Sequence, residues 1–502
     1  MSTSTTTHSG TDTRRSRPGV TLVVVLLGVL VVPMSISGAA VALPDIGRDL
    51  NTSGAPLMWV VNVYNLLFAA ITLVAGSLSD LYGRRRVFVL GGGLFAAGSL
   101  ASALAPHILL LDLARAVAGI GAAGVLASSG AILATTFDGP ARTRAFAAMG
   151  TVIGVGIAFG PTLSGWLVGS LGWRAGFLFH VVVLVAVLFG SAAIAESRAG
   201  ERPRVDTPGV VTFVLGLALV MIGLVQGPES GWAHPLIVAA LVLGLAVLGV
   251  FVAVERRSDH SVLDLTLIRN RRYTAWCVAT LVTSIGFMGT LTFLPTYFQG
   301  ASGATATGAG ATMLLMTVPV LVAPQVGGWL ITRGCPAPHL MGLALLLIAA
   351  GSAWLTVLRP GIGSLELLGP LALIGIGMGV SFGITDGQAM SQVEPERAGM
   401  AAGFLNTVRG GAEALVLAIF GSLLVSLIQS RVGSGHLAEE IAAGNLSGGE
   451  RGVLAEHFTS AWHVLLWAVA AMCVLGAALV FTMLAPRRAA RAASSRAASP
   501  RP

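Results

Sequence analysis

The chain has 502 residues, of which 55% are hydrophobic and only 10% are charged. This composition excludes an ordinary water-soluble protein, because so few charged residues could not cover the surface of a chain with a mean hydropathy of +0.84. The net charge of +8 would suit a nucleic-acid partner, but all 30 basic residues are arginines that lie between apolar runs. We therefore interpret the charge as a topology signal in a lipid bilayer and expect no nucleic-acid partner.

The chain begins with a polar tail at 1–19 and continues with an apolar run at 20–43. Residues 40–42 resemble a signal-peptide cleavage site, but the run is too long for a signal-peptide core and long enough to cross a bilayer. Thirteen more apolar runs follow, and the 65 glycines suit closely packed helices in a membrane. The predicted spans are 20–43, 57–78, 87–106, 108–136, 145–168, 174–195, 207–226, 234–254, 273–299, 308–331, 339–358, 365–390, 400–428 and 461–485. The sequence thus predicts an all-α integral membrane protein with 14 transmembrane helices.

Arginines are distributed unevenly between the two sides of these spans. With the N-terminus placed inside, internal loops and tails hold 23 arginines and external loops hold five, while Arg115 and Arg409 lie within spans. Cytoplasmic loops are enriched in arginine, and an even number of spans leaves both termini on one side. We therefore expect a multi-pass protein of the cytoplasmic (inner) membrane with both termini in the cytoplasm.

Two similar turns indicate that the chain has two related halves. Residues 76–86 combine glycines, Asp80 and three arginines, and 328–334 repeat the start of this turn with Thr332 in place of the acid. Parallel repeats of this kind are typical of transporters with a central site. The predicted parts are an N-terminal six-helix bundle at 20–195, a linker with two extra helices at 196–272, a C-terminal six-helix bundle at 273–485 with an external loop at 430–460, and tails at 1–19 and 486–502.

Span 5 carries the most informative pattern, G-x-x-x-x-x-G-P-x-x-x-G, formed by Gly154, Gly160, Pro161 and Gly165. Its glycines permit close helix packing, and Pro161 removes a backbone hydrogen bond and kinks the helix. On the residues alone, a generic glycine-rich packing helix is the alternative interpretation.

The sequence contains no convincing motif for an enzyme active site, a metal site or ATP binding. Cys277, Cys335 and Cys473 form no close pair, and the histidines are not at metal-ligand spacing. Residues 300–303 match the G-x-S-G of intramembrane serine proteases but fall in an external loop without a histidine partner. No phosphate-binding G-x-x-x-x-G-K-S/T is present. We expect no catalytic residue, no metal and no cofactor.

Several motifs occur in the order of one known transporter family. They are the turn at 76–86, Trp59-Val60-Val61 with Tyr64, Arg115 to Ala123, Gly154 to Gly165, Trp173-Arg174, and Leu294 to Gln299. Over roughly 20–485 they resemble the fourteen-helix drug:proton antiporter family of the major facilitator superfamily. The resemblance implies two six-helix bundles joined by two linking helices and a proton gradient as the energy source. The pattern in span 5 is similar to the motif that marks exporters in this superfamily. We expect a monomer.

The chain departs from the family pattern at Ser164, where the span-5 motif usually has a glycine, and at three positions in helices 1 and 4. Ser35 stands where the first helix usually carries an acid, and Ala40 where it carries an asparagine. In helix 4, Ala118 stands where a glutamine follows the arginine. A proton or cation role at the helix-1 and helix-4 positions is therefore not carried over to this chain.

The resemblance gives the turn after span 2 a role in gating. In the family such an acid pairs with nearby arginines and holds the inner side closed. Here the acid is Asp80, beside Gly83 and Arg84, with Arg142 or Arg144 of the next internal loop as partners. The alternative is a turn residue that only fixes topology.

Charged residues within the spans are the candidates for proton coupling, because each costs about 2.5–3.5 kcal/mol on insertion scales. Asp112 lies three residues before Arg115 on one helical face, which favours a local pair with or without a link to protons. Glu413 lies four residues after Arg409. It either forms an ion pair with Arg409 within the helix or is a protonatable site that faces the cavity. Asp386 lies well inside span 12. It either has a functional role or is simply buried at the cytoplasmic end of the helix. A carboxyl group removed from water there could exchange protons near neutral pH.

Helices 1, 2, 4, 5, 9, 10, 12 and 13 are expected to line a midplane cavity that opens to alternate sides. The predicted lining residues are Asn62, Asn65, Phe68, Phe287, Phe293, Gln388, Phe404 and Asn406. Such apolar and neutral polar side chains suit an amphipathic organic compound. We expect proton-driven export of a drug- or antibiotic-like small molecule. A transporter of a native metabolite or lipid, and a non-transporting membrane sensor, remain alternatives.

Overall fold

The computed structural model describes residues 18–197, 207–256, 270–393, 398–446 and 451–484. The helices are α1 (Pro18–Asp49), α2 (Gly54–Tyr82), α3 (Arg84–Leu104), α4 (Ile108–Thr136), α5 (Gly139–Leu171), α6 (Arg174–Gly190), α7 (Thr207–Ser230), α8 (Pro235–Glu255), α10 (Arg271–Gly300), α11 (Ala306–Thr332), α12 (Ala337–Trp354), α13 (Leu368–Met390), α14 (Ala398–Val432), α15 (Gly435–Ala442) and α16 (Arg451–Leu484), with 3-10 turns η1 (Ser191–Ala193), η2 (Leu355–Val357) and η3 (Ser364–Leu367). In this described part of the chain, 14 helices are long and apolar enough to cross a membrane, all except α15. The predicted all-α membrane fold with 14 spans is confirmed.

The segment at 430–460 differs from the expected loop. Helix α14 continues to Val432, α15 follows almost at once, and α16 already begins at Arg451. The Ser434 side chain accepts a hydrogen bond from the backbone N–H of Leu437 at 3.3 Å, which caps the start of α15. The prediction of one long external loop was therefore wrong, because a serine cap and an apolar helix face allow part of this segment to fold.

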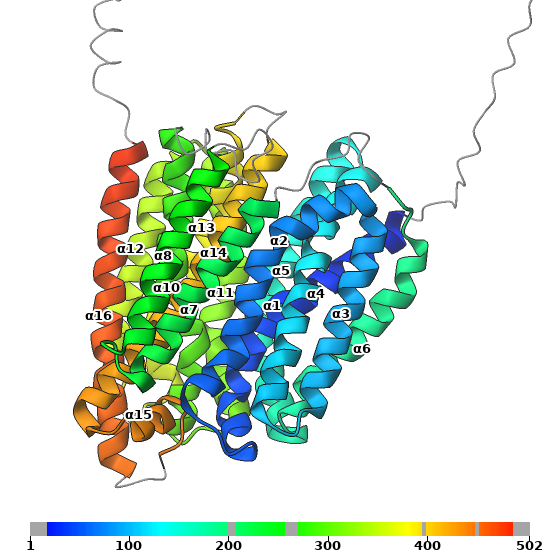
Figure 1. The fold of residues 1–502 in the computed structure, drawn as a ribbon. Helices are drawn as coiled ribbons and strands as arrows, with labels where there is room; N and C mark the ends of the chain where they lie inside the picture. Colours follow the sequence, from blue (N-terminus) through cyan, green and yellow to red (C-terminus); the bar gives the residue numbers. More distant parts are fainter. Residues whose placement is uncertain (1–17, 198–206, 257–269, 394–397, 447–450, 485–502) are drawn as a thin grey trace, which may run out of the picture.

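The long helices form two groups. Helices α1 to α6 pack mainly on one another, and α10 to α14 pack with α16 in the second group (Figure 1). Helices α7 and α8 pair with each other, and α7 contacts both α2 and α14. Helix α7 therefore lies along the seam where the first and second groups meet, and α8 packs on α7.

Glycines bring neighbouring backbones into direct contact within each group. A Cβ atom at Gly98 of α3 would lie 2.6 Å from the backbone nitrogen of Ala118 of α4. A Cβ atom at Gly383 of α13 would lie 2.6 Å from the carbonyl oxygen of Pro324 of α11. In lipid, helices associate through such close packing rather than through apolar burial, which explains the high glycine content.

The two ends of the molecule carry different elements. The first described residue, Pro18, lies toward the same end as Leu484, and α15 lies at the opposite end (Figure 1). Because the spans alternate in direction, the C-terminal end of α5 and the N-terminal end of α11 both lie at the end of α15. The contact between α5 and α11 therefore lies at this end of the molecule.

Candidate functional site

At the end of the molecule that carries α15, the two groups of helices meet along α5 and α11. A Cβ atom at Gly310 would lie 2.5 Å from the carbonyl oxygen of Pro161, and one at Gly165 would collide with the carbonyl oxygen of Ala306. Only glycine permits backbones to approach this closely. We call this contact the α5–α11 seal.

Threonine hydroxyls join the two backbones of the seal. The bonds run from Thr162 to the carbonyl oxygen of Gly310 (2.9 Å), from Thr307 to that of Gly165 (3.0 Å) and from Thr317 to that of Ala158 (2.7 Å). Donors on both helices thus bind carbonyl oxygens on the other helix. The seal combines steric fit with hydrogen bonds that break if the groups separate.

The pattern in span 5 is divided between two neighbours of α5. Gly160 faces α1, where a Cβ atom would collide with the hydroxyl of Ser37, and Gly165 faces α11. Pro161 lies inside the continuous helix and presents its carbonyl oxygen to α11. A Cβ atom at Gly154 would only make an ordinary contact of 3.8 Å with Leu321. Packing therefore requires glycine at two of the three glycine positions.

Toward the middle of the molecule, seven helices enclose a cavity of ≈ 120 Å³. We call it the central chamber, and α1, α2, α4, α5, α10, α13 and α14 contribute to its wall. Most of the wall is apolar and includes Val32, Ile36, Phe68, Leu126, Ile153, Ile157, Met288, Leu291 and Phe382. The eighth helix expected in this wall, α11, lies in the seal instead.

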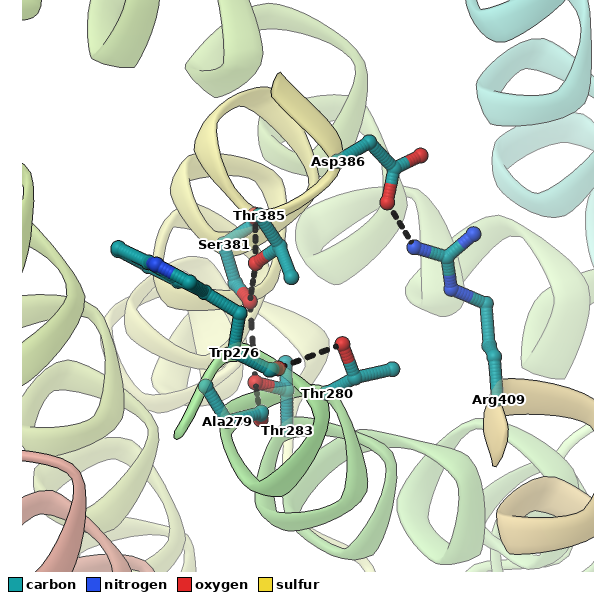
Figure 2. Close-up of polar contacts among 8 residues, drawn as sticks. All are labelled: Trp276, Ala279, Thr280, Thr283, Ser381, Thr385, Asp386 and Arg409. Atoms are coloured by element: carbon teal, nitrogen blue, oxygen red, sulfur yellow. Dashed lines mark hydrogen bonds and ion pairs between the residues drawn. The ribbon is translucent and has the colours of Figure 1, made fainter. Parts of the chain in front are cut away.

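Four polar side chains also line the central chamber. Ser37 and Thr72 donate to carbonyl oxygens of their own helices. Arg409 of α14 forms an ion pair with Asp386 of α13, which Figure 2 shows from the side. Glu413 makes no hydrogen bond or ion pair with any described residue. An apolar wall therefore carries one carboxyl group that forms neither a hydrogen bond nor an ion pair within the described part of the chain.

Of the two interpretations of Glu413, the intrahelical ion pair with Arg409 is not formed among the described residues. The four-residue spacing puts both side chains on one face of α14, but the guanidinium of Arg409 extends across to Asp386 and lies 5.2 Å from the ring centroid of Phe382. Asp386 is not buried, since its side chain is 56% exposed. The neighbouring helix, rather than the next turn, supplies the anion for Arg409.

Arg115 occupies a second polar centre, within the first group of helices. It donates to the hydroxyl of Ser35 at 2.7 Å and to the carbonyl oxygen of Val60 at 3.0 Å. Its guanidinium carbon lies 4.1 Å from the ring centroid of Tyr64. The buried Oδ1 of Asp112 has no hydrogen-bond partner in the described chain. The expected Asp112–Arg115 pair was therefore wrong, because the guanidinium reaches across to α1 and α2.

The turn between α2 and α3 is held by Glu196, which the sequence analysis did not single out. Gly83 has a φ of 115°, in the region that favours glycine. The carboxylate of Glu196 accepts from the backbone N–H of Arg85 at 3.2 Å and lies 3.6 Å from Nε of Arg86. Glu196 is the first acid of the basic internal loop that follows span 6, so charge complementarity between internal loops could have found it.

The structure describes the side chains of only some of the residues predicted to form the inner gate. Arg84 donates its backbone N–H to the carbonyl oxygen of Ser197 at 3.0 Å, and Arg144 is exposed. The side chains of Asp80 and Arg142 lie outside the described residues. Their pairing stays a prediction.

The profile of the Major Facilitator Superfamily matches residues 25–417, more than half of the chain. The chain belongs to the major facilitator superfamily. The family resemblance is thus confirmed, and the chain is a transport protein rather than an enzyme.

Relatives within the superfamily are named for resistance and export. Multidrug resistance protein Stp of Mycobacterium tuberculosis (strain CDC 1551 / Oshkosh) is 32% identical over 414 residues, which cover 82% of this chain and 76% of that protein. Puromycin resistance protein pur8 of Streptomyces alboniger is 32% identical over 446 residues, which cover 85% of this chain and 88% of that protein. A solved POT family transporter in complex with 5-aminolevulinic acid has a TM-score of 0.64 at 14% identity, covers 92% of this chain and 96% of its own, and supports the fold alone.

The aromatic residues predicted to line the cavity of this superfamily member fall in different places. Phe68 lines the central chamber. Phe287 and Phe293 are buried in the second group, where Phe293 stacks on Phe420 with ring centroids 5.5 Å apart. Their assignment to the cavity was wrong, because their helix turns these side chains toward its neighbours. The side chain of Phe404 lies outside the described residues.

The predicted polar lining residues do not contribute to the central chamber. Asn65 donates to the carbonyl oxygen of Val61 in its own helix at 3.0 Å, and Asn62 lines a separate outer pocket near α7. Gln388 is absent from the chamber wall, and the side chain of Asn406 lies outside the described residues. The assignments of Asn62, Asn65 and Gln388 were wrong, because the chamber wall begins only at Phe68 on α2 and is formed on α13 by Phe382.

Two residues that the sequence analysis missed lie one helical turn from residues that it named. Thr72 follows Phe68 by four positions, and Phe382 precedes Asp386 by four. Residues four apart share a helix face, so extending each named residue by one turn could have found them.

Proposed function

We propose that this protein exports an amphipathic drug- or antibiotic-like small molecule across the cytoplasmic (inner) membrane in exchange for protons. The observation that carries the proposal is the central chamber, an apolar cavity between the two groups of helices whose wall includes the unpaired carboxyl group of Glu413. Relatives named for multidrug and puromycin resistance support an organic cargo.

Alternating access requires the α5–α11 seal to open and close. With both termini in the cytoplasm, as the arginine distribution predicts, the seal closes the outer side of the membrane. The turn that contains Asp80, with Arg142 or Arg144, is then the inner gate. Cargo would enter the central chamber from the inner side and leave when the two backbones of the seal separate.

We assign proton coupling to Glu413, with the Asp386–Arg409 ion pair as its switch. A carboxyl group without a cation is compatible with an apolar chamber when it carries a proton and costly when it does not. Arg409 lies one helical turn from Glu413, so loss of the proton favours a move of the guanidinium from Asp386 to Glu413. Such an exchange would change the contact between α13 and α14 each time a proton is bound or released.

Transport in inverted membrane vesicles tests this assignment. A panel of cationic, neutral and anionic antibiotics is supplied under an imposed pH gradient to the parent protein, Glu413→Gln and Asp386→Asn. We expect gradient-dependent transport in the parent, none in Glu413→Gln and a reduced rate in Asp386→Asn. Glu366→Gln is the matched control, because Glu366 forms an exposed ion pair with Arg359 away from the chamber.

Each contradictory outcome has a definite meaning. Gradient-dependent transport that persists in both variants rejects coupling in the second half and points to Asp112 and Arg115. Transport by the parent that ignores the gradient rejects proton exchange and indicates a uniporter. A parent that moves no member of the panel rejects a drug-like cargo in favour of a native metabolite or lipid.

A further inference from the structure

A second cavity adjoins the central chamber, between α10, α13 and α14. Its volume is ≈ 10 Å³, about the space that one water molecule occupies. Phe382 and Arg409 line both cavities, so the two share part of their walls. We call it the side chamber, and its hydroxyl-bearing residues are Thr280, Thr283, Ser284, Ser381 and Thr385.

Most of these hydroxyl groups have already used their only proton. Three of them donate to backbone carbonyl oxygens, as Figure 2 shows: Thr280 to Trp276 (3.1 Å), Thr283 to Ala279 (2.7 Å) and Thr385 to Ser381 (2.7 Å). The hydroxyls of Thr283 and Ser381 are 3.0 Å apart, so the proton between them must come from Ser381. The oxygen atoms of this cluster can therefore serve a ligand only as acceptors.

Ser284 differs from the other hydroxyl residues. It is only 2% exposed and lines the side chamber, yet it makes no hydrogen bond with any described residue. Its hydroxyl can therefore form a hydrogen bond with a polar group that enters the side chamber. The side chamber thus contains a binding group that the protein itself leaves unused.

The charges around the side chamber disfavour an ionic ligand. A cation would be repelled by the guanidinium of Arg409, which lines the side chamber, and the carboxylate of Asp386 is already paired with that guanidinium. An anion would meet the acceptor oxygens of the threonine cluster. A neutral group that donates a hydrogen bond avoids both penalties and matches the acceptors.

We propose that the side chamber binds a neutral hydrogen-bond donor of the cargo, a hydroxyl or an amide N–H, while the apolar body of the cargo lies in the central chamber. This inference rests on the proposed export of amphipathic small molecules and adds a chemical requirement to it. The size of the side chamber limits the group to about the volume of one water molecule. Discrimination between cargoes would therefore depend on single hydroxyl groups.

Matched pairs of compounds that differ by one hydroxyl test this inference. The pairs are hydrocortisone with corticosterone, doxorubicin with daunorubicin, and erythromycin A with erythromycin B, each measured by equilibrium dialysis against the purified full-length protein. We expect the parent to bind the hydroxylated member of at least one pair about three- to tenfold more tightly, the range of one hydrogen bond. Ser284→Ala and Thr280→Val should bring that ratio close to one by weakening only the hydroxylated compound.

The matched control is Thr292→Val. Thr292 is also a buried hydroxyl of α10 without a partner in the described chain, but it lines neither chamber, so the variant should keep the ratio of the parent. Equal weakening of both members by Ser284→Ala, or no preference by the parent in any pair, would overturn the inference. A parent that binds no compound at all rejects the proposed drug-like cargo, which is a different failure.

Discussion

The guanidinium of Arg115 is completely buried, yet the hydrogen bonds that anchor it go to neutral oxygen atoms. The guanidinium donates to the hydroxyl and carbonyl oxygens of Ser35 in α1 and to the carbonyl oxygen of Val60 in α2. The ring of Tyr64 covers the face of the guanidinium. Ser35 stands where the resemblance to the drug:proton antiporter family places an acid. Because serine keeps a hydrogen-bond acceptor without a negative charge, this chain retains the anchoring of the arginine but not an ion pair.

Ser35→Ala is expected to lower the thermal stability of the purified protein. The change removes the acceptor 2.7 Å from the guanidinium and leaves a buried N–H without a partner, which costs about 1–3 kcal/mol. The measurement is the midpoint of thermal unfolding in detergent. Ser37→Ala is the control, because Ser37 donates only to Pro33 within its own helix. Equal midpoints for the two variants would show that Ser35 does not anchor the arginine.

Helix α5 is the element that joins the two groups at the seal. One face of it packs on α1 at Gly160, and another packs on α11 at Gly165. Close contact with the Ser37 hydroxyl of α1 on one side and with the backbone of α11 on the other makes this helix sensitive to added volume at these points.

Gly165→Ala should abolish or strongly reduce export, whereas Gly154→Ala should stay near the parent. The added methyl group at position 165 collides with the carbonyl oxygen of Ala306 and pushes α11 away, while that at position 154 makes an ordinary 3.8 Å contact with Leu321. The rates are compared in the vesicle assay at equal amounts of protein. Similar activity of the two variants would contradict a role for close packing in the seal.

At the scale of the whole molecule, the proposed export by alternating access requires the two groups of helices to move relative to each other. The α5–α11 seal lies at one end, the central chamber lies between the groups, and α7 contacts both α2 and α14 at the seam. Transport by alternating access predicts that a bond across the seal stops the cycle.

A reversible disulfide across the seal tests that movement. A Cβ atom at position 169 would lie 3.6 Å from the Cβ atom of Thr307, within the range of about 3.5–4.5 Å that disulfides require. In a background without Cys277, Cys335 and Cys473, Gly169→Cys combined with Thr307→Cys should lose export on oxidation and regain it on reduction.

The two single-cysteine variants are the controls for the disulfide, since neither can form a bond across the seal. They should export at the same rate before and after oxidation. Undiminished export by the oxidised double variant would mean that the seal stays closed during transport, and alternating access at this end would be rejected.

The sequence by itself determined the number and approximate position of the spans and, through its motifs, the family. These properties depend on local composition, because each crossing needs about 20 apolar residues whatever its neighbours are. The close packing at Gly160 and Gly165 was also predictable, since only glycine lets backbones meet. The helical part of 430–460 was missed because its caps and apolar face are weaker signals than those of a span.

Only the tertiary structure decided which side chains meet. Arg409 pairs with Asp386 instead of Glu413, and Phe68 lines the central chamber while Phe293 packs in the interior. The helical period shows which residues share a face, but not which way that face turns. The rotation of each helix follows from packing between helices that are far apart in the sequence, and this rotation leaves Glu413 without a partner in the chamber.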